Sequence, residues 1–299
     1  MKLFAVKAID VAGLDNGVYS FAKTETQAHD HILVTGAPGA GKTRLLELIV
    51  TARQVLASGV RTFRQESFIR RENKTCKVAL AWELDAEEQA SIGAPRSVVS
   101  TEVIFRKDEE DEVDRRMEFL LQRYGHDDDT PKFEYLSARR RLDTGGGGAS
   151  LEPDEQQGLR TEPSPRKHSW VPAFLAELPD HPERAARFAR GVALLSPSCV
   201  YDPARNALSS NGRVLRSLNE LSASEADAVM FASTAALVGL SRSIVLVDRP
   251  ELHGIEPERI VGGLSALGED NQLIFASSSP ALAADFPGGR VTVGAGGGA

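Results

Sequence analysis

Several features that mark secreted, membrane or zinc-binding proteins are scarce in this sequence. Its 299 residues include only two cysteines, Cys76 and Cys199, and neither has a histidine or cysteine neighbour at zinc-ligand spacing. This scarcity excludes a disulfide framework and predicts a reducing, cytoplasmic setting. No apolar run approaches the length of a membrane span, and the N-terminal stretch MKLFAVKAIDVAG lacks the long apolar core of a signal peptide. We therefore expect no membrane contact.

Positive charge is also in short supply. The formal net charge is -7, so the average field of the chain does not attract nucleic acid. A local basic face is left open, and the alternative is a set of solvated arginines paired with carboxylates. The acidic run DEEDEVD over residues 108–114 predicts a solvated turn or helix start rather than a metal site. The candidates for a basic face are Arg61, Arg64, Arg70, Arg71, Arg139, Arg140 and Arg141.

One glycine-rich stretch has the composition of a phosphate-binding loop. GAPGAGKT has the spacing G-x-x-x-x-G-K-T, in which glycines turn backbone N–H groups inward, lysine reaches phosphates and threonine ligates Mg²⁺. The apolar run HILVTG before it predicts a strand, and TRLLELIVTARQVLASG after it predicts a helix ending near Gly59. That helix would point its N-terminus at the phosphates. We predict that a nucleoside triphosphate contacts Gly36, Ala37, Pro38, Gly39, Ala40, Gly41, Lys42, Thr43 and Arg44.

A second informative block lies near the C-terminus. SIVLVD is almost entirely apolar, as expected of a buried parallel strand, and it delivers Asp248 at its carboxyl end. An acid there can order Mg²⁺ through water opposite Thr43. QLIFASSSP predicts a second strand, and VGGLSALGE between the two predicts a helix. The resulting β-α-β unit favours a parallel sheet.

The remaining segments predict one domain with an interrupted middle. Residues 1–142 would form an N-terminal lobe, in which VALAWELDAEE and SVVSTEVIFR predict an antiparallel hairpin over 78–106. Residues 143–169 are rich in Gly, Pro, Gln and Glu and predict a flexible insertion. Residues 170–293 would supply a helical part and the second strand block, and 294–299 a flexible tail.

In this order the motifs resemble those of the ABC-type ATPases, specifically the RecF, SMC and OLD-like branch found in DNA repair and phage defence. GAPGAGKT is similar to the Walker A motif of that branch, and NELSASE (Asn219–Glu225) stands at its signature. IVLVDRPELHGIEP resembles Walker B with its following loop. SSSP (Ser277–Pro280) stands where relatives carry the switch sequence Thr-His-Ser-Pro. YLSARRRL is a weaker match to an arginine segment before the signature. The resemblance covers both ends of the chain and little of its middle.

The resemblance implies an α/β fold of the ABC-ATPase head type. It would combine a largely parallel central sheet carrying the phosphate loop and Asp248, an antiparallel side sheet from the N-terminal strand and residues 78–106, and a helical subdomain before Ser222. The resemblance also implies ATP and Mg²⁺ as cofactors, with Thr43 and Asp248 at the metal. The long coiled coil of SMC proteins is not expected, because the middle has no sustained heptads.

In the family, two subunits meet head to tail, and the signature serine of one contacts the γ-phosphate held by the other. Here that serine is Ser222, just before a predicted helix whose dipole would face the triphosphate. Ser222 with Glu225 also fits an ordinary capping box, which needs no nucleotide. The family's glycines after the serine are Ala223 and Ser224 here, which hinders close backbone approach. The implied assembly is a homodimer or heteromer.

Two residues that hydrolysis needs in the family are replaced. The family has a glutamate directly after the Walker B aspartate and a switch histidine, whereas this chain has Arg249 and Ser278. An arginine cannot accept a proton at any useful pH, and a serine cannot replace the histidine unaided. Glu251 is the nearest candidate for a replacement base, and the alternative is that it is only a loop residue of the Pro-Glu-Leu-His run.

These observations leave three functions open. The first is a subunit that binds ATP and Mg²⁺ as a dimerisation or assembly switch, with little hydrolysis, beside an effector such as a nuclease. The second is an active ATPase, or a composite site completed by a partner, that drives a DNA transaction. The third is a scaffold that has lost nucleotide binding, against which Lys42, Thr43 and Asp248 argue.

Overall fold

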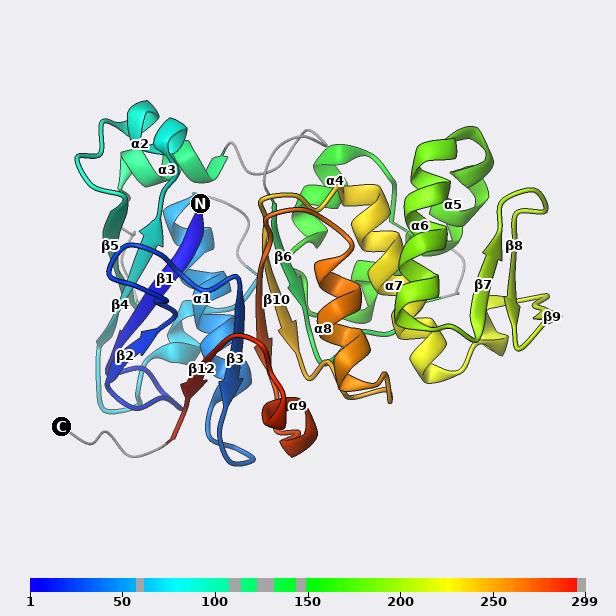
Figure 1. The fold of residues 1–299 in the computed structure, drawn as a ribbon. Helices are drawn as coiled ribbons and strands as arrows, with labels where there is room; N and C mark the ends of the chain where they lie inside the picture. Colours follow the sequence, from blue (N-terminus) through cyan, green and yellow to red (C-terminus); the bar gives the residue numbers. More distant parts are fainter. Residues whose placement is uncertain (58–61, 108–113, 123–131, 144–148, 295–299) are drawn as a thin grey trace.

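The computed structural model describes residues 1–57, 62–107, 114–122, 132–143 and 149–294 (Figure 1). Several expectations therefore lie outside the described residues: the helix end at Gly59, the basic-face candidate Arg61, most of the acidic run, residues 144–148 of the insertion and the tail after Gly294. Within the described part of the chain, no helix combines the length and apolar composition that crossing a bilayer requires.

A parallel sheet divides the molecule, with the N-terminal lobe on one side and the later helices on the other (Figure 1). Every neighbouring pair in it runs parallel, which confirms the predicted central sheet. Its strands are apolar because both faces are covered: all residues of Ile244–Asp248 and Gln272–Ala276 are buried. The strand order is β12 (Gly289–Thr292), β3 (His31–Thr35), β11 (Gln272–Ala276), β10 (Ile244–Asp248) and β6 (Phe133–Leu136).

Successive residues of β3 pack their side chains into two separate hydrophobic cores, one on each face of the sheet. Ile32 and Val34 join the core formed with α1 (Lys42–Leu56) and the antiparallel sheet, whereas Leu33 joins the core of the later helices. This period of two is what a strand buried on both faces requires. The helices of the second core include α5 (Val171–Glu177), α6 (Pro182–Leu195), α7 (Ala223–Val238) and α8 (Pro257–Ser265).

The antiparallel side sheet has the order β2 (Gly17–Ser20), β1 (Lys2–Ile9), β4 (Thr75–Glu83) and β5 (Val98–Arg106). The predicted hairpin over 78–106 is confirmed, but its first strand is shorter than the run VALAWELDAEE. That strand ends at Glu83 because Asp85 accepts a hydrogen bond from the Glu88 backbone and begins helix α2 (Ala86–Ile92) with a capping box. A short helix, α3 (Arg115–Gln122), follows β5 in the sequence.

Within the predicted flexible insertion over 143–169, the described residues 149–169 include regular structure. This segment forms α4 (Pro153–Leu159) and a 3-10 turn, Pro165–His168. The Tyr135 backbone N–H donates to the Arg160 carbonyl at 2.9 Å, and the buried Lys167 amine donates to the Tyr135 carbonyl at 2.7 Å. The segment therefore satisfies the open edge of β6 through hydrogen bonds that hydrophobic periodicity does not report.

A small antiparallel sheet, which sequence patterns did not predict, follows α6. Its order is β7 (Cys199–Asp202), β8 (Ala207–Ser210) and β9 (Arg213–Val214). It lies at the far edge of the molecule from the N-terminal lobe (Figure 1). The remaining elements are α9 (Pro280–Ala284) and three 3-10 turns, Gln65–Phe68, Leu178–Asp180 and Leu218–Glu220.

Candidate functional site

The phosphate loop Gly36–Thr43 joins β3 to α1 through left-handed backbone that favours glycine. Gly39 has φ 80 and Gly41 has φ 102, and a Cβ at Gly41 would come within 2.4 Å of the Gly13 carbonyl oxygen. Gly41 also stands at the N-cap of α1, where no side chain accepts a bond from the first-turn amides. The loop thus presents backbone donors and a helix N-terminus, which together suit an anion.

Lys42 lies back across the start of this loop. Its Nζ donates to the carbonyl oxygens of Gly36 and Ala37, each at 2.8 Å. Burial and the nearby Arg249 guanidinium lower the pKa of the Lys42 amine. An ammonium held over loop carbonyls is positioned to meet a phosphate entering the loop.

Thr43 and Asp248 are brought together by the parallel sheet, although 205 residues separate them in the sequence. The Thr43 hydroxyl lies 3.0 Å from each Asp248 carboxylate oxygen. Burial raises the pKa of Asp248, against the lowering effects of the Thr43 hydrogen bond and of Arg249. The described residues contain no cluster of three or more His, Cys, Asp or Glu that could hold a metal. An Mg²⁺ held by one hydroxyl, one carboxylate, water and phosphate oxygens needs no such cluster.

Arg249 follows Asp248 at a sharp turn out of β10. Its backbone has φ 47, and its N–H donates to the Ala276 carbonyl at 2.8 Å, which holds the turn against β11. The side chain is exposed, and its charge lowers the pKa of both Lys42 and Asp248. The guanidinium is therefore near the phosphate loop, where the family resemblance expects a glutamate.

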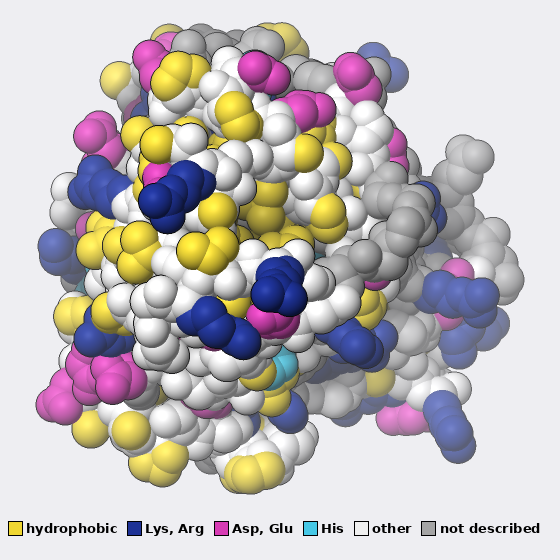
Figure 2. Space-filling view, turned by 90° about the vertical axis from the view of Figure 1, so that its right-hand side faces the viewer, with side chains coloured by type: hydrophobic (Ala, Val, Ile, Leu, Met, Phe, Trp, Pro, Cys, Tyr) yellow, Lys and Arg dark blue, Asp and Glu magenta, His cyan; other side chains and the backbone are white. Residues whose placement is uncertain are grey.

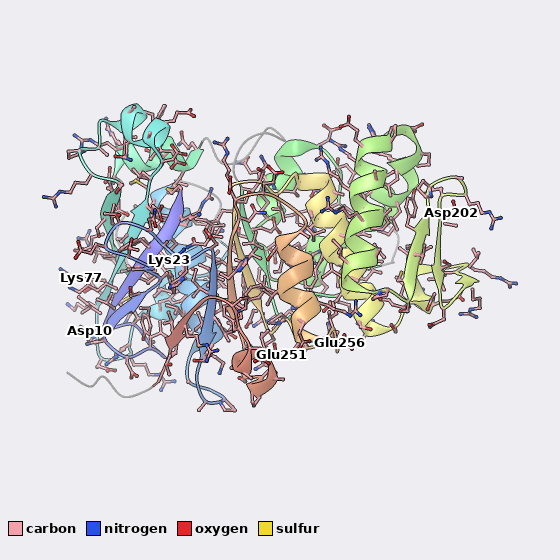
Figure 3. The ribbon with its side chains drawn as sticks, viewed as in Figure 1. Asp10, Lys23, Lys77, Asp202, Glu251 and Glu256 are labelled. Carbon is pink, nitrogen blue, oxygen red and sulfur yellow. The ribbon has the colours of Figure 1, made fainter. Side chains whose placement is uncertain are left out.

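Glu251 and Ser278 meet at the same end of the sheet. The Ser278 N–H donates to Glu251 Oε1 at 3.4 Å, and the Glu251 carboxylate partly offsets the lowering of the Lys42 pKa by burial and Arg249. Glu251 Oε2 is buried and has no hydrogen-bond partner among the described residues. Figure 3 shows Glu251 beside α9, with Glu256 near the start of α8. Glu251 is thus a carboxylate in the loop after β10 that contacts the start of the loop after β11.

Ser222 caps α7, as the capping-box interpretation predicts. Ser222 Oγ accepts from the Glu225 N–H at 3.3 Å, and Glu225 Oε2 accepts from the Ser222 N–H at 2.9 Å. Glu225 Oε1 also accepts from Ser210 at 2.6 Å, which ties the helix start to β8. Burial works against ionisation of Glu225, but hydrogen bonds from Ser210 and Ser222 lower its pKa. Ser222 itself is exposed, so a contact with a partner's nucleotide stays a prediction.

Arg140, one of the candidates for a basic face, instead lies in the interior and is paired with a carboxylate. Among the candidates for a basic face, Arg139 and Arg141 are exposed, but Arg140 is only 3% exposed. Its guanidinium binds the Asp227 carboxylate, with Nη2 at 2.9 Å, and donates to the carbonyls of Asp248 and Arg249. Three consecutive arginines look alike in a sequence, so the only signal for this role was the likeness of YLSARRRL to a family segment.

A cleft of about 460 Å³ lies beside this arginine, between residues 138–142 and the start of α7. Figure 2 shows the face at the right-hand side of Figure 1, which carries interspersed basic and acidic side chains around hydrophobic ones. This face therefore does not have the charge pattern of a nucleic-acid footprint.

Comparison with known proteins gives structural matches only. No protein-family model matches the chain, and no curated protein matches it. The SmcHead bound to the C-winged helix domain of ScpA matches with a TM-score of 0.55 and 12% identity, covering 94% of this chain and 91% of that one. The SMC head domain from Thermotoga maritima matches with a TM-score of 0.51, 12% identity and the same coverages.

RecF, described as a recombination mediator protein, matches in its ATPrS complex with a TM-score of 0.51 and 10% identity. The match covers 98% of this chain and 96% of RecF. These alignments span nearly the whole of each chain, so they include both the side sheet and the helical part. The chain therefore has the ABC-type ATPase fold shared by SMC head domains and RecF.

Proposed function

We propose that this chain binds ATP with Mg²⁺ and uses them as a dimerisation or assembly switch, with weak or no hydrolysis of its own. One observation carries the proposal: Thr43 and Asp248 meet at 3.0 Å beside the phosphate loop, while Arg249 occupies the position next to Asp248. The residues for holding nucleotide are together, and the residue at the base position cannot accept a proton.

The side chains at the loop fit ATP and Mg²⁺. Backbone N–H groups of Gly36–Gly41 and the Lys42 amine would bind the phosphates, and the Thr43 hydroxyl and the Asp248 carboxylate would hold the metal. Bound Mg²⁺ would neutralise phosphate charge. RecF, which shares the fold, has been solved as RecF-ATP, and this supports ATP as the nucleotide.

Weak hydrolysis follows from the two replaced positions. A positioned general base typically contributes about 10²- to 10⁴-fold in rate, and Arg249 cannot provide it. Arg249 can instead donate to a phosphate oxygen, since its exposed guanidinium lies near Lys42 and Asp248. Such a contact would hold the triphosphate without promoting attack by water.

The switch would act through head-to-tail pairing with a second copy or a related subunit. The exposed Ser222 supports this geometry, because the cap of α7 is free to approach a partner's phosphate loop. An SMC head has been solved with a domain of ScpA, which supports a protein partner, and an effector such as a nuclease is one candidate. We propose that the assembly acts in DNA maintenance, and phage defence is the second setting. Comparing phage infection of cells that carry the wild type with infection of cells that carry Lys42→Ala would test the second setting.

The test combines ATP calorimetry in Mg²⁺ with phosphate release, on the wild type and on Arg249→Glu. We expect ATP binding with negligible release in the wild type and measurable release in the variant. Arg242→Glu is a matched control, because Arg242 is also exposed and has φ 50. Phosphate release from the wild type at the rate of active ATPases would contradict a switch without hydrolysis, and absent ATP binding would leave only a scaffold.

A second candidate function, an active ATPase, is favoured by the position of Glu251. Its buried Oε2 has no partner among the described residues, and its charge reaches Lys42. A carboxylate so placed can act as general base if water reaches it. Glu251→Gln separates the two functions: it abolishes release if Glu251 is the base and leaves a switch unchanged.

A further inference from the structure

We propose that Arg140 is a positioning residue that couples the signature helix α7 to the turn after Asp248, so that nucleotide at the phosphate loop changes the position of Ser222. This inference rests on the proposed ATP switch and deepens it by naming the internal connection. The observation behind it is a buried cation that contacts both elements at once.

The contacts of Arg140 use its whole guanidinium fork. On the side of α7, Nε lies 3.1 Å from each Asp227 carboxylate oxygen, and Nη2 lies 2.9 Å from Oδ2. On the side of β10, Nη1 donates to the Asp248 carbonyl at 2.8 Å and Nη2 to the Arg249 carbonyl at 3.0 Å. Both side chains of the pair are fully buried. The two elements therefore share one rigid, planar group.

Burial makes this connection stiff. If α7 moved without Arg140, a carboxylate or a guanidinium would be left buried and unpaired, which is strongly unfavourable. The Arg140 guanidinium also lies over the Phe231 ring, 5.1 Å from its centroid, one helical turn beyond Asp227. A shift of the Asp248–Arg249 backbone on nucleotide binding should thus be transmitted to α7, which begins directly after Ser222.

His253 adds a second connection to the same carboxylate. Its Nδ1 lies 2.9 Å from Asp227 Oδ1, and its side chain is 28% exposed. The Leu252 N–H donates back to the Arg249 carbonyl at 3.1 Å. Asp227 therefore contacts the end of the turn directly and its beginning through Arg140, so the turn and the helix form one unit.

A purely structural role for Arg140 makes a different prediction. Substituting a purely structural residue would lower the melting temperature, and ATP affinity and ATP-dependent association would both fall with it. A positioning residue should separate two measurements: ATP affinity at the phosphate loop, which needs only local donors, and nucleotide-dependent association, which needs Ser222 in place. The variants therefore keep a polar side chain of similar size while removing the guanidinium fork or the carboxylate that it binds.

The test uses Arg140→Lys and Asp227→Asn in the full chain, with Arg139→Lys as the exposed, matched control. We expect ATP affinity within about threefold of wild type, and ATP-dependent association weakened by about tenfold or more in both variants, within the usual range for coupled sites. Arg139→Lys should behave as wild type. Association unchanged in both variants, or affinity and association falling together with the melting temperature, would overturn the inference.

A second measurement needs no variant and covers the case in which both fail to fold. Hydrogen exchange of the wild type would be followed with and without Mg²⁺-ATP, at a protein concentration below that at which it associates. We expect slower exchange in residues 137–141 and 223–230 as well as in the phosphate loop. Protection confined to residues 36–45 would overturn the coupling while leaving ATP binding intact, whereas no protection anywhere would overturn the proposed function itself.

Discussion

Two neighbouring regions at the carboxyl end of the parallel sheet differ in how completely they are built. The phosphate-holding region, with Lys42, Thr43 and Asp248, has all its groups in mutual contact or aimed at the loop. The second region has Arg249 directly after β10 and Ser278 after β11, at the positions where the family resemblance expects a base and a γ-phosphate sensor. On the proposed function, this difference would separate nucleotide binding from hydrolysis within one fold.

The physical reason is the number of groups on which phosphate binding and hydrolysis each depend. Holding phosphate depends on several backbone N–H groups and a helix N-terminus, so no single side chain decides it. Proton abstraction depends on one atom of one side chain. One substitution can therefore remove hydrolysis and leave the nucleotide site unchanged.

The largest change in phosphate release should come from restoring the family's base and sensor residues at positions 249 and 278. We expect Arg249→Glu with Ser278→His to raise phosphate release by about 10²- to 10⁴-fold, the usual contribution of a positioned base. The measurement is single-turnover phosphate release at saturating ATP. A double variant that binds ATP but releases no phosphate would show that further groups needed for hydrolysis are missing. Positions 249 and 278 would then not account for the difference between the two regions.

Breaking the first region should have the next largest effect. Lys42→Met removes charge-assisted hydrogen bonds, and we expect ATP affinity to fall by about 10- to 100-fold. Lys23→Met, at an exposed lysine of the N-terminal lobe, is the control. Calorimetry with Mg²⁺ measures both, and equal affinities would place the nucleotide elsewhere.

Acidification should weaken the metal part of the first region. Because burial raises the pKa of Asp248, its carboxylate is lost at a higher pH than that of an exposed aspartate. The Mg²⁺-dependent gain in ATP affinity should then fall by up to about tenfold per pH unit below the raised pKa. Calorimetry with and without Mg²⁺, from about pH 8 to about pH 5, checks this. Asp248→Asn should show no such slope.

The contribution of Asp248 to the free energy of unfolding of the ligand-free protein should change with pH in the opposite direction to the Mg²⁺-dependent ATP affinity. The raised pKa means that the folded state binds the Asp248 proton more tightly than the unfolded state. The stabilisation from that proton is present at acidic pH and is lost as pH rises through the raised pKa. Asp248→Asn should therefore be more stable than the wild type at neutral pH without Mg²⁺, and a less stable variant would contradict the burial argument.

The smallest effect concerns the cap of α7. Ser222→Ala removes one N-cap hydrogen bond and should lower the free energy of unfolding by about 1 kcal/mol. If Ser222 also contacts a partner's nucleotide, ATP-dependent association should weaken beyond this loss. Ser217→Ala, at the cap of the preceding 3-10 turn, is the control. Unchanged association would reduce Ser222 to a capping residue.

Most of the phosphate-holding region could be predicted from local patterns. GAPGAGKT lies between a strand and a helix, as its spacing indicates, and SIVLVD is a buried strand that ends at Asp248. The contact of Thr43 with Asp248 followed because parallel strands bring their carboxyl ends to one edge. The loop and the two strands depend on residues adjacent in the chain, so composition and period predict them, and the Thr43–Asp248 contact then depends only on the parallel arrangement of the strands.

Tertiary structure decided the rest. It buried Arg140 and left Arg139 and Arg141 exposed, and it packed residues 149–169 along β6 where the sequence indicated a flexible insertion. Both outcomes depend on hydrogen bonds between segments distant in the chain, such as Arg140 to Asp227. Local periodicity contains no information on which polar side chain will find such a partner. The sequence by itself determined the phosphate loop, the parallel sheet and the replaced positions 249 and 278, and only the fold decided which arginine joins α7 to β10.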